Sequence, residues 1–166
     1  MFMVGDVGPG GGIVFSVTNG GTSGLEVGAV TNDLGELVPA VSPSRLAWGC
    51  FDVNADGFDN FTDNGEVAFG PFNEIPSGLI SSGAITSNGC FSPALQAATD
   101  FGAGWYLPST IELTVLLSSG ILELGTYWSS TEDNNKSAFA VLGNGVPTNT
   151  DKNEPRLVVP VRQFKL

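Results

Sequence analysis

The chain contains no histidine, and its only two cysteines, Cys50 and Cys90, lie far apart in sequence. The commonest general base and the commonest transition-metal ligand are therefore missing. No Cys-x-x-Cys spacing for redox chemistry or zinc is present either. Without a Ser/His/Asp or Cys/His set for nucleophilic catalysis, we expect the protein not to be an enzyme.

Basic residues are almost as scarce. Lys and Arg total 6 against 17 Asp and Glu, which gives a net charge of −11 at pH 7. Between Glu26 and Glu74 there are nine acidic residues and a single base, Arg45. Because nucleic acids are bound largely through Lys and Arg, this composition argues against a nucleic-acid partner and weighs against a heparin-like ligand.

Long apolar runs are absent as well. No window approaches the roughly 20 apolar residues of a membrane-spanning helix, so we expect no direct insertion into a membrane. Gly, Ser, Thr and Asn are abundant, and only 14% of the residues are charged. A chain of 166 residues with this composition predicts a single domain over residues 1–166, rich in β-strands and loops.

Short runs of β-branched and aromatic residues, separated by Gly- and Asn-rich turns, predict the strands. The first two strands are expected to form a hairpin about the turn at residues 19–21. The expected strands are 12–18, 24–30, 37–41, 45–48, 126–130, 137–142 and 156–164.

Two helices are expected in the second half of the chain. Ser92 is a good N-cap and Pro93 suits the first helical position, while Gly102 ends that helix. Ser109 and Glu112 have the spacing of a capping box and begin the second helix, which gives Glu112 a structural task. The core-facing positions of the second helix are expected to be Ile111, Val115 and Leu116 or Leu117.

Residues 50–90 are expected to form a long irregular region bounded by the two cysteines. An even cysteine count in a Gly- and Asn-rich acidic chain fits one Cys50–Cys90 disulfide, with two buried free thiols as the alternative.

Within this region, DVNADGFDNFTD at residues 52–63 has the spacing of a twelve-residue calcium loop. Gly57 occupies the position where such a loop turns sharply. Asn, Asp and Gly also form ordinary turns, but we favour a structural Ca²⁺ because so many neighbouring carboxylates would otherwise repel. The expected ligands are Asp52, Asn54, Asp56, Phe58 (through its backbone carbonyl), Asn60 and Asp63.

The polar residues between the last strands are the best candidates for contact with a partner. Loops held on a rigid scaffold commonly carry recognition, although solvated loop tips are the alternative. The tryptophans and tyrosines, which can stack on sugars, are expected in the core instead. The candidate ligand-binding residues are Asn134, Asn135, Lys136, Asn149, Asp151, Lys152 and Asn153.

Several motifs occur in a fixed order: GPGGGIVF at residues 8–15, Trp48-Gly49-Cys50, GWYLPS at 104–109, YWSSTE at 127–132 and VPVRQF at 159–164. Together they resemble the C-terminal domain of the collagen-like adhesin Lcl and its relatives. The resemblance implies an α+β, C-type-lectin-like fold, with two helices packed on small twisted antiparallel sheets and long loops. It also implies homotrimers on bacterial surfaces or phage fibres that bind glycans. The strong acidity of this chain speaks against sulfated glycans.

The sequence thus favours an extracellular, cell-surface or virion binding module, an adhesin or receptor-binding head for a glycan or a surface protein. The alternative is an assembly or decoration module of a phage tail, capsid or surface filament. An oxidase on the same fold would need reactive cysteines, which a permanent disulfide excludes.

Overall fold

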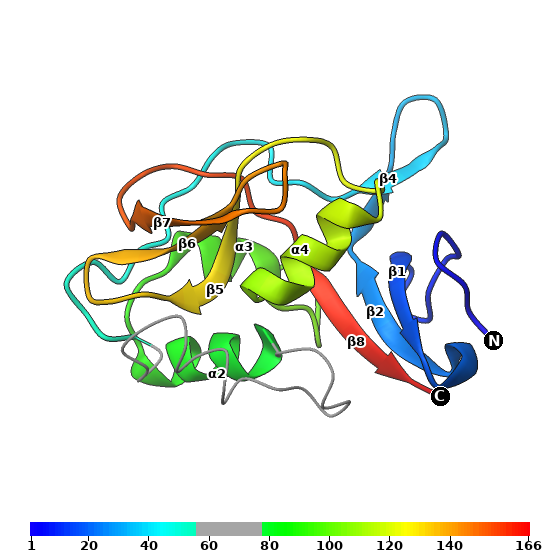
Figure 1. Cartoon of the computed structure of the whole chain (residues 1–166), viewed down its shortest axis with the longest axis horizontal. Coiled ribbons are helices and arrows are strands. Elements are labelled where there is room, and N and C mark those ends of the chain that lie inside the picture. Colours follow the sequence, from blue (N-terminus) through cyan, green and yellow to red (C-terminus); the bar gives the residue numbers. More distant parts are fainter. Residues whose placement is uncertain (56–77) are drawn as a thin grey trace.

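The computed structural model describes residues 1–55 and 78–166. These residues form a mixed α+β structure with three α-helices and three small antiparallel sheets. One sheet lies beside both chain termini, and a second lies at the far end of the long axis (Figure 1). The α+β class expected from the sequence is confirmed, with one helix more than expected.

The sheet near the termini joins the two ends of the chain. Its strands are β1 (Ile13–Thr18), β2 (Ser23–Val27) and β8 (Val161–Lys165), in the order β1-β2-β8. The 3-10 turn η1 (Asn19–Gly21) links β1 to β2, which confirms the predicted hairpin. Because β8 pairs with β2, the last strand of the chain lies in the same sheet as the first two strands.

The predicted second strand, 24–30, is divided in two. After β2, Gly28 leaves the ladder and its N–H donates to the carbonyl of Pro160. A Cβ at this position would collide with Pro160 and with the ring of Phe101, so the chain passes close to both. Strand β3 (Ala29–Thr31) then pairs only with β4 (Leu37–Pro39).

The sheet at the far end has the order β5-β6-β7, with β5 (Tyr127–Glu132), β6 (Ser137–Val141) and β7 (Pro147–Asp151). Strand β7 was missed because its sequence, PTNTD, has no apolar alternation. Two other expectations were wrong. Residues 45–48 make only one isolated bridge, Leu46 with Arg156, and the strand predicted over 156–164 begins at Val161.

The helices are α2 (Gly78–Asn88), α3 (Pro93–Thr99) and α4 (Thr110–Ser118). Helix α2 corrects the expectation that residues 50–90 are irregular throughout. Its buried face consists of Gly78, Ser81, Ser82 and Ile85. Because three of these four residues are small and not strongly apolar, the sequence lacks the periodic apolar pattern that predicts a helix. The N-cap of α3 at Ser92 is confirmed, as is the capping box of α4.

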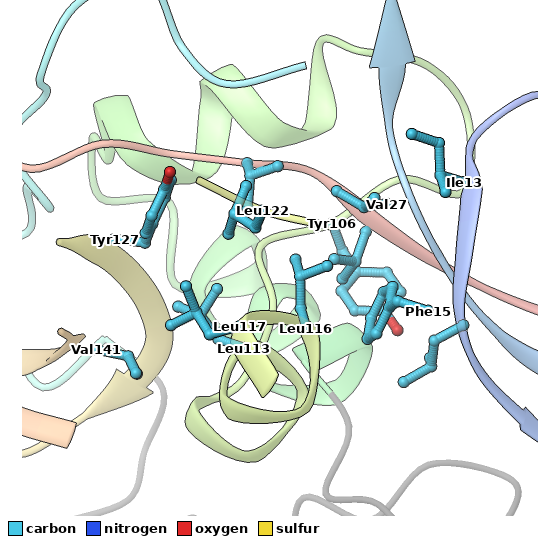
Figure 2. Close-up of a cluster of buried hydrophobic side chains, with 13 residues drawn as sticks. Ile13, Phe15, Val27, Tyr106, Leu113, Leu116, Leu117, Leu122, Tyr127 and Val141 are labelled. Carbon is cyan, nitrogen blue, oxygen red and sulfur yellow. The ribbon is translucent and has the colours of Figure 1, made fainter. Parts of the chain in front are cut away.

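Helix α4 contributes three leucines to one core cluster, whose other members come mainly from the β-strands. Figure 2 shows Leu113, Leu116 and Leu117 directed toward residues of the β-sheets and toward Tyr106. Ile111, which was expected to face this core, is 36% exposed, and Val115 is only partly buried. The reason is that the capping box turns the Glu112 position inward, so the buried stripe runs through 112, 113, 116 and 117.

A second core cluster lies between α2, α3 and the β5–β6 strands, and it contains Trp48, Leu107 and Trp128. The prediction that the tryptophans and the two tyrosines are core residues is confirmed. Cys50 and Cys90 form a disulfide, as predicted. Closing a loop with a sequence separation of 40 stabilises the fold by about 3–4 kcal/mol in the chain-entropy account.

Glu112 connects two helices through one buried carboxylate. It accepts hydrogen bonds from the N–H of Ser109 at 2.9 Å, from the N–H of Gly78 at 2.6 Å and from the hydroxyl of Tyr106 at 2.9 Å. Removal from water raises the pKa of Glu112 from 4.5 to about 7, and the hydrogen bonds oppose this rise. The first residue of α2 and the N-cap of α4 therefore share a carboxyl group whose pKa lies near neutral pH.

We predict that Glu112→Gln removes part of the pH dependence of stability. Because the folded-state pKa is raised, the stabilising effect of protonation is complete below the unfolded pKa of 4.5 and is lost as pH rises through about 7. Glu112 therefore lowers the free energy of unfolding by about 3 kcal/mol between pH 4.5 and pH 8, a loss that the glutamine variant does not suffer. Urea unfolding at both pH values measures this. The exposed control Glu36→Gln should follow the wild type, and a constant difference between Glu112→Gln and wild type would refute the prediction.

Candidate binding site

A fully buried ion pair links the last residue of β5 to the residue that follows β7. The Nζ atom of Lys152 is 2.7 Å from Oε2 of Glu132, and neither side chain is exposed to solvent. Lys152 also donates to the carbonyl of Val53 at 2.9 Å and approaches that of Cys50 at 3.3 Å. Its ammonium group lies 4.8 Å from the centroid of the Trp48 ring, a cation–π distance.

The carboxylate of Glu132 is hydrogen-bonded as well. The N–H of Ala55 donates to both of its oxygens, at 2.9 and 3.1 Å. The pair thus joins the last residue of β5, the residue after β7 and the segment that follows Cys50. Because a buried charge is tolerated only when it is neutralised and hydrogen-bonded, these three segments fix one another in place.

Lys152 was expected to contact a partner at the surface, and this expectation was wrong. The side chain is 0% exposed. Along β7 and just beyond it, Thr150 and Lys152 point inward while Asn149, Asp151 and Asn153 point outward. The sequence does not show this alternation, because residues 149–153 are all polar, and the partner that makes a buried lysine acceptable, Glu132, is 20 positions away.

The β5–β6 hairpin forms a polar turn that is shaped by its own side chains. Oδ1 of Asn134 accepts from the N–H of Lys136 at 2.8 Å and from that of Ser137 at 3.0 Å. The carboxylate of Asp133 accepts from Ser137 and Asn134, and also from the side-chain amide of Asn149 on β7. Asn134 and Asn149 are therefore partly occupied in holding the turn.

The end of β7 lies beside this turn, since Ser137 pairs with Asp151. Oδ1 of Asp151 accepts from the N–H of Asn153 at 2.8 Å, which closes a second small turn. Six of the seven candidate ligand-binding residues are exposed here, and their role in binding stays a prediction. We call this surface the polar tip: Asp133, Asn134, Asn135, Lys136, Asn149, Asp151 and Asn153.

The candidate calcium loop begins against the polar tip. The N–H of Asp52 donates to the carbonyl of Asn135 at 2.8 Å. Cys50 and Asp52 have φ values of +51° and +63°, a conformation that costs a non-glycine residue energy and that the disulfide and the ion pair hold in place. The side chains of Asp52 and Asn54 are exposed.

The other four expected calcium ligands, Asp56, Phe58, Asn60 and Asp63, lie outside the described residues. Within residues 1–55 and 78–166, no three His, Cys, Asp or Glu residues come together as a metal-binding group. In the same ranges, no helix is both long and apolar enough to cross a bilayer.

Two hollows flank the β3–β4 hairpin. One, of about 400 Å³, is lined by aliphatic residues, two serines, two prolines and Phe101. The other, of about 390 Å³, contains the single carboxylate of Glu123 among its described lining residues. Neither brings together the acid, base or nucleophile that a catalytic site needs among the described residues.

Comparison of the chain with models of known protein families gives no match, and comparison with curated proteins gives none either. The resemblance to the Lcl domain therefore stays a prediction based on the order of the motifs.

We predict that Lys152→Met destabilises the fold by about 3–5 kcal/mol, because it leaves the Glu132 carboxylate buried without its counter-ion. Lys136→Met, in the exposed turn, should change the free energy of unfolding by less than about 0.5 kcal/mol. The double variant Lys152→Met/Glu132→Gln should recover part of the loss, because the neutral glutamine still accepts from Ala55. Denaturant unfolding compares the four proteins, and equal stability of Lys152→Met and Lys136→Met would contradict the role given to the pair.

Proposed function

We propose that this chain is a non-catalytic binding module, an adhesin or receptor-binding head that contacts a glycan or a surface protein. The observation that carries this proposal is the position of the polar tip. It lies at the end of the long axis opposite both chain termini (Figure 1). A domain attached to a larger assembly through either terminus would present this tip outward.

Rigidity of the tip supports the proposal. Recognition surfaces bind more tightly when little ordering is needed on contact. Here the turn is held by the side chains of Asp133 and Asn134, and its base is held by the buried Lys152–Glu132 pair. Asn135 and Lys136 are left exposed at the summit, and their backbone positions are fixed by bonds to Asp52 and Lys152.

We further propose the C-type-lectin-like fold and membership of the Lcl family. The proposal is supported by the places of the motif residues. YWSSTE is buried throughout β5, and Trp105 to Ser109 of GWYLPS are buried at the entrance to α4. The cysteine of Trp48-Gly49-Cys50 forms a disulfide with Cys90, as the even cysteine count predicts. A disulfide also favours an oxidising location, such as a cell surface or virion.

The alternative, an assembly or decoration module, is favoured by exposed apolar side chains around the termini. Association through this end, which we propose to be homotrimeric, would cover them and leave the polar tip free. Size-exclusion chromatography with light scattering gives the oligomeric state, and a trimer that binds no glycan or receptor would favour the assembly role. The exposed side chains are Met1, Met3, Val4, Val7 and Leu166.

We also propose a structural Ca²⁺ in the loop at residues 52–63. The exposed carboxylate of Asp52 and the side-chain oxygen of Asn54 are the hard donors that Ca²⁺ prefers, which supports the proposal without testing the other ligands. The ion would stiffen the loop that adjoins the polar tip.

We predict that Ca²⁺ raises the melting temperature, because a ligand present at 100 times its Kd stabilises the folded state by about 2.7 kcal/mol. Asp52→Asn should weaken this effect by removing one negative charge from the site. Calorimetric titration and thermal melts test both statements, with the exposed Asp33→Asn as the matched control. Absence of both heat and a melting shift with Ca²⁺ would exclude the site.

We predict that Asn135→Ala/Lys136→Ala weakens partner binding and leaves stability unchanged. The two side chains are exposed at the summit of the polar tip, and surface changes of this kind usually alter the free energy of unfolding by less than about 0.5 kcal/mol. A glycan array carrying neutral, sialylated and sulfated glycans, followed by affinity measurement on each glycan bound by wild type, should show a loss of at least about tenfold.

The matched control for this experiment is Asp33→Ala/Glu36→Ala, which removes two exposed side chains from the β3–β4 turn. This protein should bind like wild type. If the Asn135/Lys136 variant kept every glycan that wild type binds, the polar tip would not be the contact surface.

A further inference from the structure

Phe91 exposes an aromatic ring from a rigid stretch of backbone. The residue is 72% exposed, and its ring stacks on no other described ring. Its backbone is fixed on both sides. Cys90 is in the disulfide, the carbonyl of Phe91 accepts from the N–H of Cys50 at 3.0 Å, and the hydroxyl of Ser92 donates to the carbonyl of Trp48.

The ring borders a shallow hollow of about 180 Å³ between the end of α2 and the first turns of α3. The side-chain amide of Gln96 lines this hollow and has no hydrogen-bond partner among the described residues. The hydroxyls of Thr86 and Thr99 also line it, and each donates to a backbone carbonyl of its own helix. Their oxygens therefore remain available as acceptors.

The hollow is open, and its described lining residues are uncharged. No Asp, Glu, Lys or Arg is among its described lining residues, although the chain carries a net charge of −11. Gly89, at its rim, has open space in front of it, since a Cβ there would meet no described atom within 4 Å. Among the described residues, a ligand that approaches this surface meets one apolar ring face and neutral hydrogen-bonding groups, with no charged side chain.

We propose that this hollow, the Phe91 subsite, binds a neutral sugar ring. A pyranose has an apolar face of C–H groups that suits stacking on an aromatic ring, and hydroxyls that donate and accept hydrogen bonds. The Gln96 amide supplies both a donor and an acceptor, and the threonine oxygens supply further acceptors. A volume equal to roughly six water molecules suits a single ring rather than a drug-sized ligand.

The Phe91 subsite adjoins the polar tip. Cys50 bonds to Phe91, and Asp52, two residues further along, bonds to Asn135 of the tip. The two surfaces thus flank one short segment of backbone, residues 50–52. This inference rests on the binding role proposed above and specifies a ligand class for that end of the molecule.

The test is an NMR titration of ¹⁵N-labelled protein with methyl β-galactoside, methyl α-mannoside, methyl β-glucoside and N-acetylglucosamine, and with glucuronate as a charged comparison. We expect at least one neutral sugar to shift amide signals of residues 86–99 with a Kd on the order of 1 mM, and glucuronate to bind no better. Phe91→Ala should weaken the binding about tenfold, Gln96→Ala several-fold, and Phe91→Tyr little. Leu124→Ala, at a side chain 83% exposed, is the matched control.

The outcomes separate this proposal from the role of the polar tip. Shifts confined to residues 133–153 would support glycan binding at the tip and overturn the Phe91 subsite. No shift with any neutral sugar, or equal affinity of Phe91→Ala and Leu124→Ala, would overturn the subsite. Binding at the polar tip is then tested separately by Asn135→Ala/Lys136→Ala. If Phe91→Ala instead abolished self-association seen by light scattering, the ring would belong to a contact between copies, which also overturns the proposal. Should Phe91→Ala fail to fold, the comparison of Phe91→Tyr with Gln96→Ala decides.

Discussion

The buried pair of Lys152 and Glu132 is the interaction on which the far end of the molecule depends. An ammonium group without solvent needs a counter-ion and hydrogen-bond acceptors, and here these come from β5 and from the backbone after Cys50. If either β5 or the segment after Cys50 moved alone, Lys152 would lose its counter-ion or its backbone acceptors. The position of the polar tip relative to the disulfide-linked segment is therefore set by the ion pair inside the core together with one backbone hydrogen bond at the surface, from Asp52 to Asn135.

Glu112 is a second buried carboxylate that attaches a backbone segment to the core. It does so on the C-terminal side of residues 56–77, whereas Glu132 does so on the N-terminal side. Ala55 donates its N–H to Glu132, and Gly78 donates its N–H to Glu112. Both flanks of this stretch are thus attached to the core through backbone bonds to a buried acid, and the disulfide adds a covalent tie between Cys50 and Cys90. The two acids differ in one respect: Glu132 has a counter-ion, whereas Glu112 accepts only from neutral donors among the described residues, and its removal from water raises its pKa to about 7.

Features set by neighbouring residues were predictable from the sequence. The capping box at Ser109, the N-cap at Ser92 and the hairpin at residues 19–21 depend on contacts only a few positions apart. Features that depend on distant partners were not. Helix α2 packs through small residues, β7 gains its place by pairing with β6, and Lys152 is buried only because Glu132 is opposite. Phe91 was not predicted as a binding residue, because one apolar residue before a helix gives no periodic signal.

The motifs that carry the family resemblance do structural work in this molecule. A Cβ on Gly8 or Gly10 would overlap the buried carboxylate of Glu26, so those glycines let the first loop close over the Glu26–Arg162 ion pair. YWSSTE ends in Glu132 and supplies the core ion pair. If the motifs specify the scaffold, the choice of ligand must reside in the segments between them. The polar tip and the proposed Phe91 subsite both lie in such segments, so either surface can change while the motifs and the scaffold stay the same.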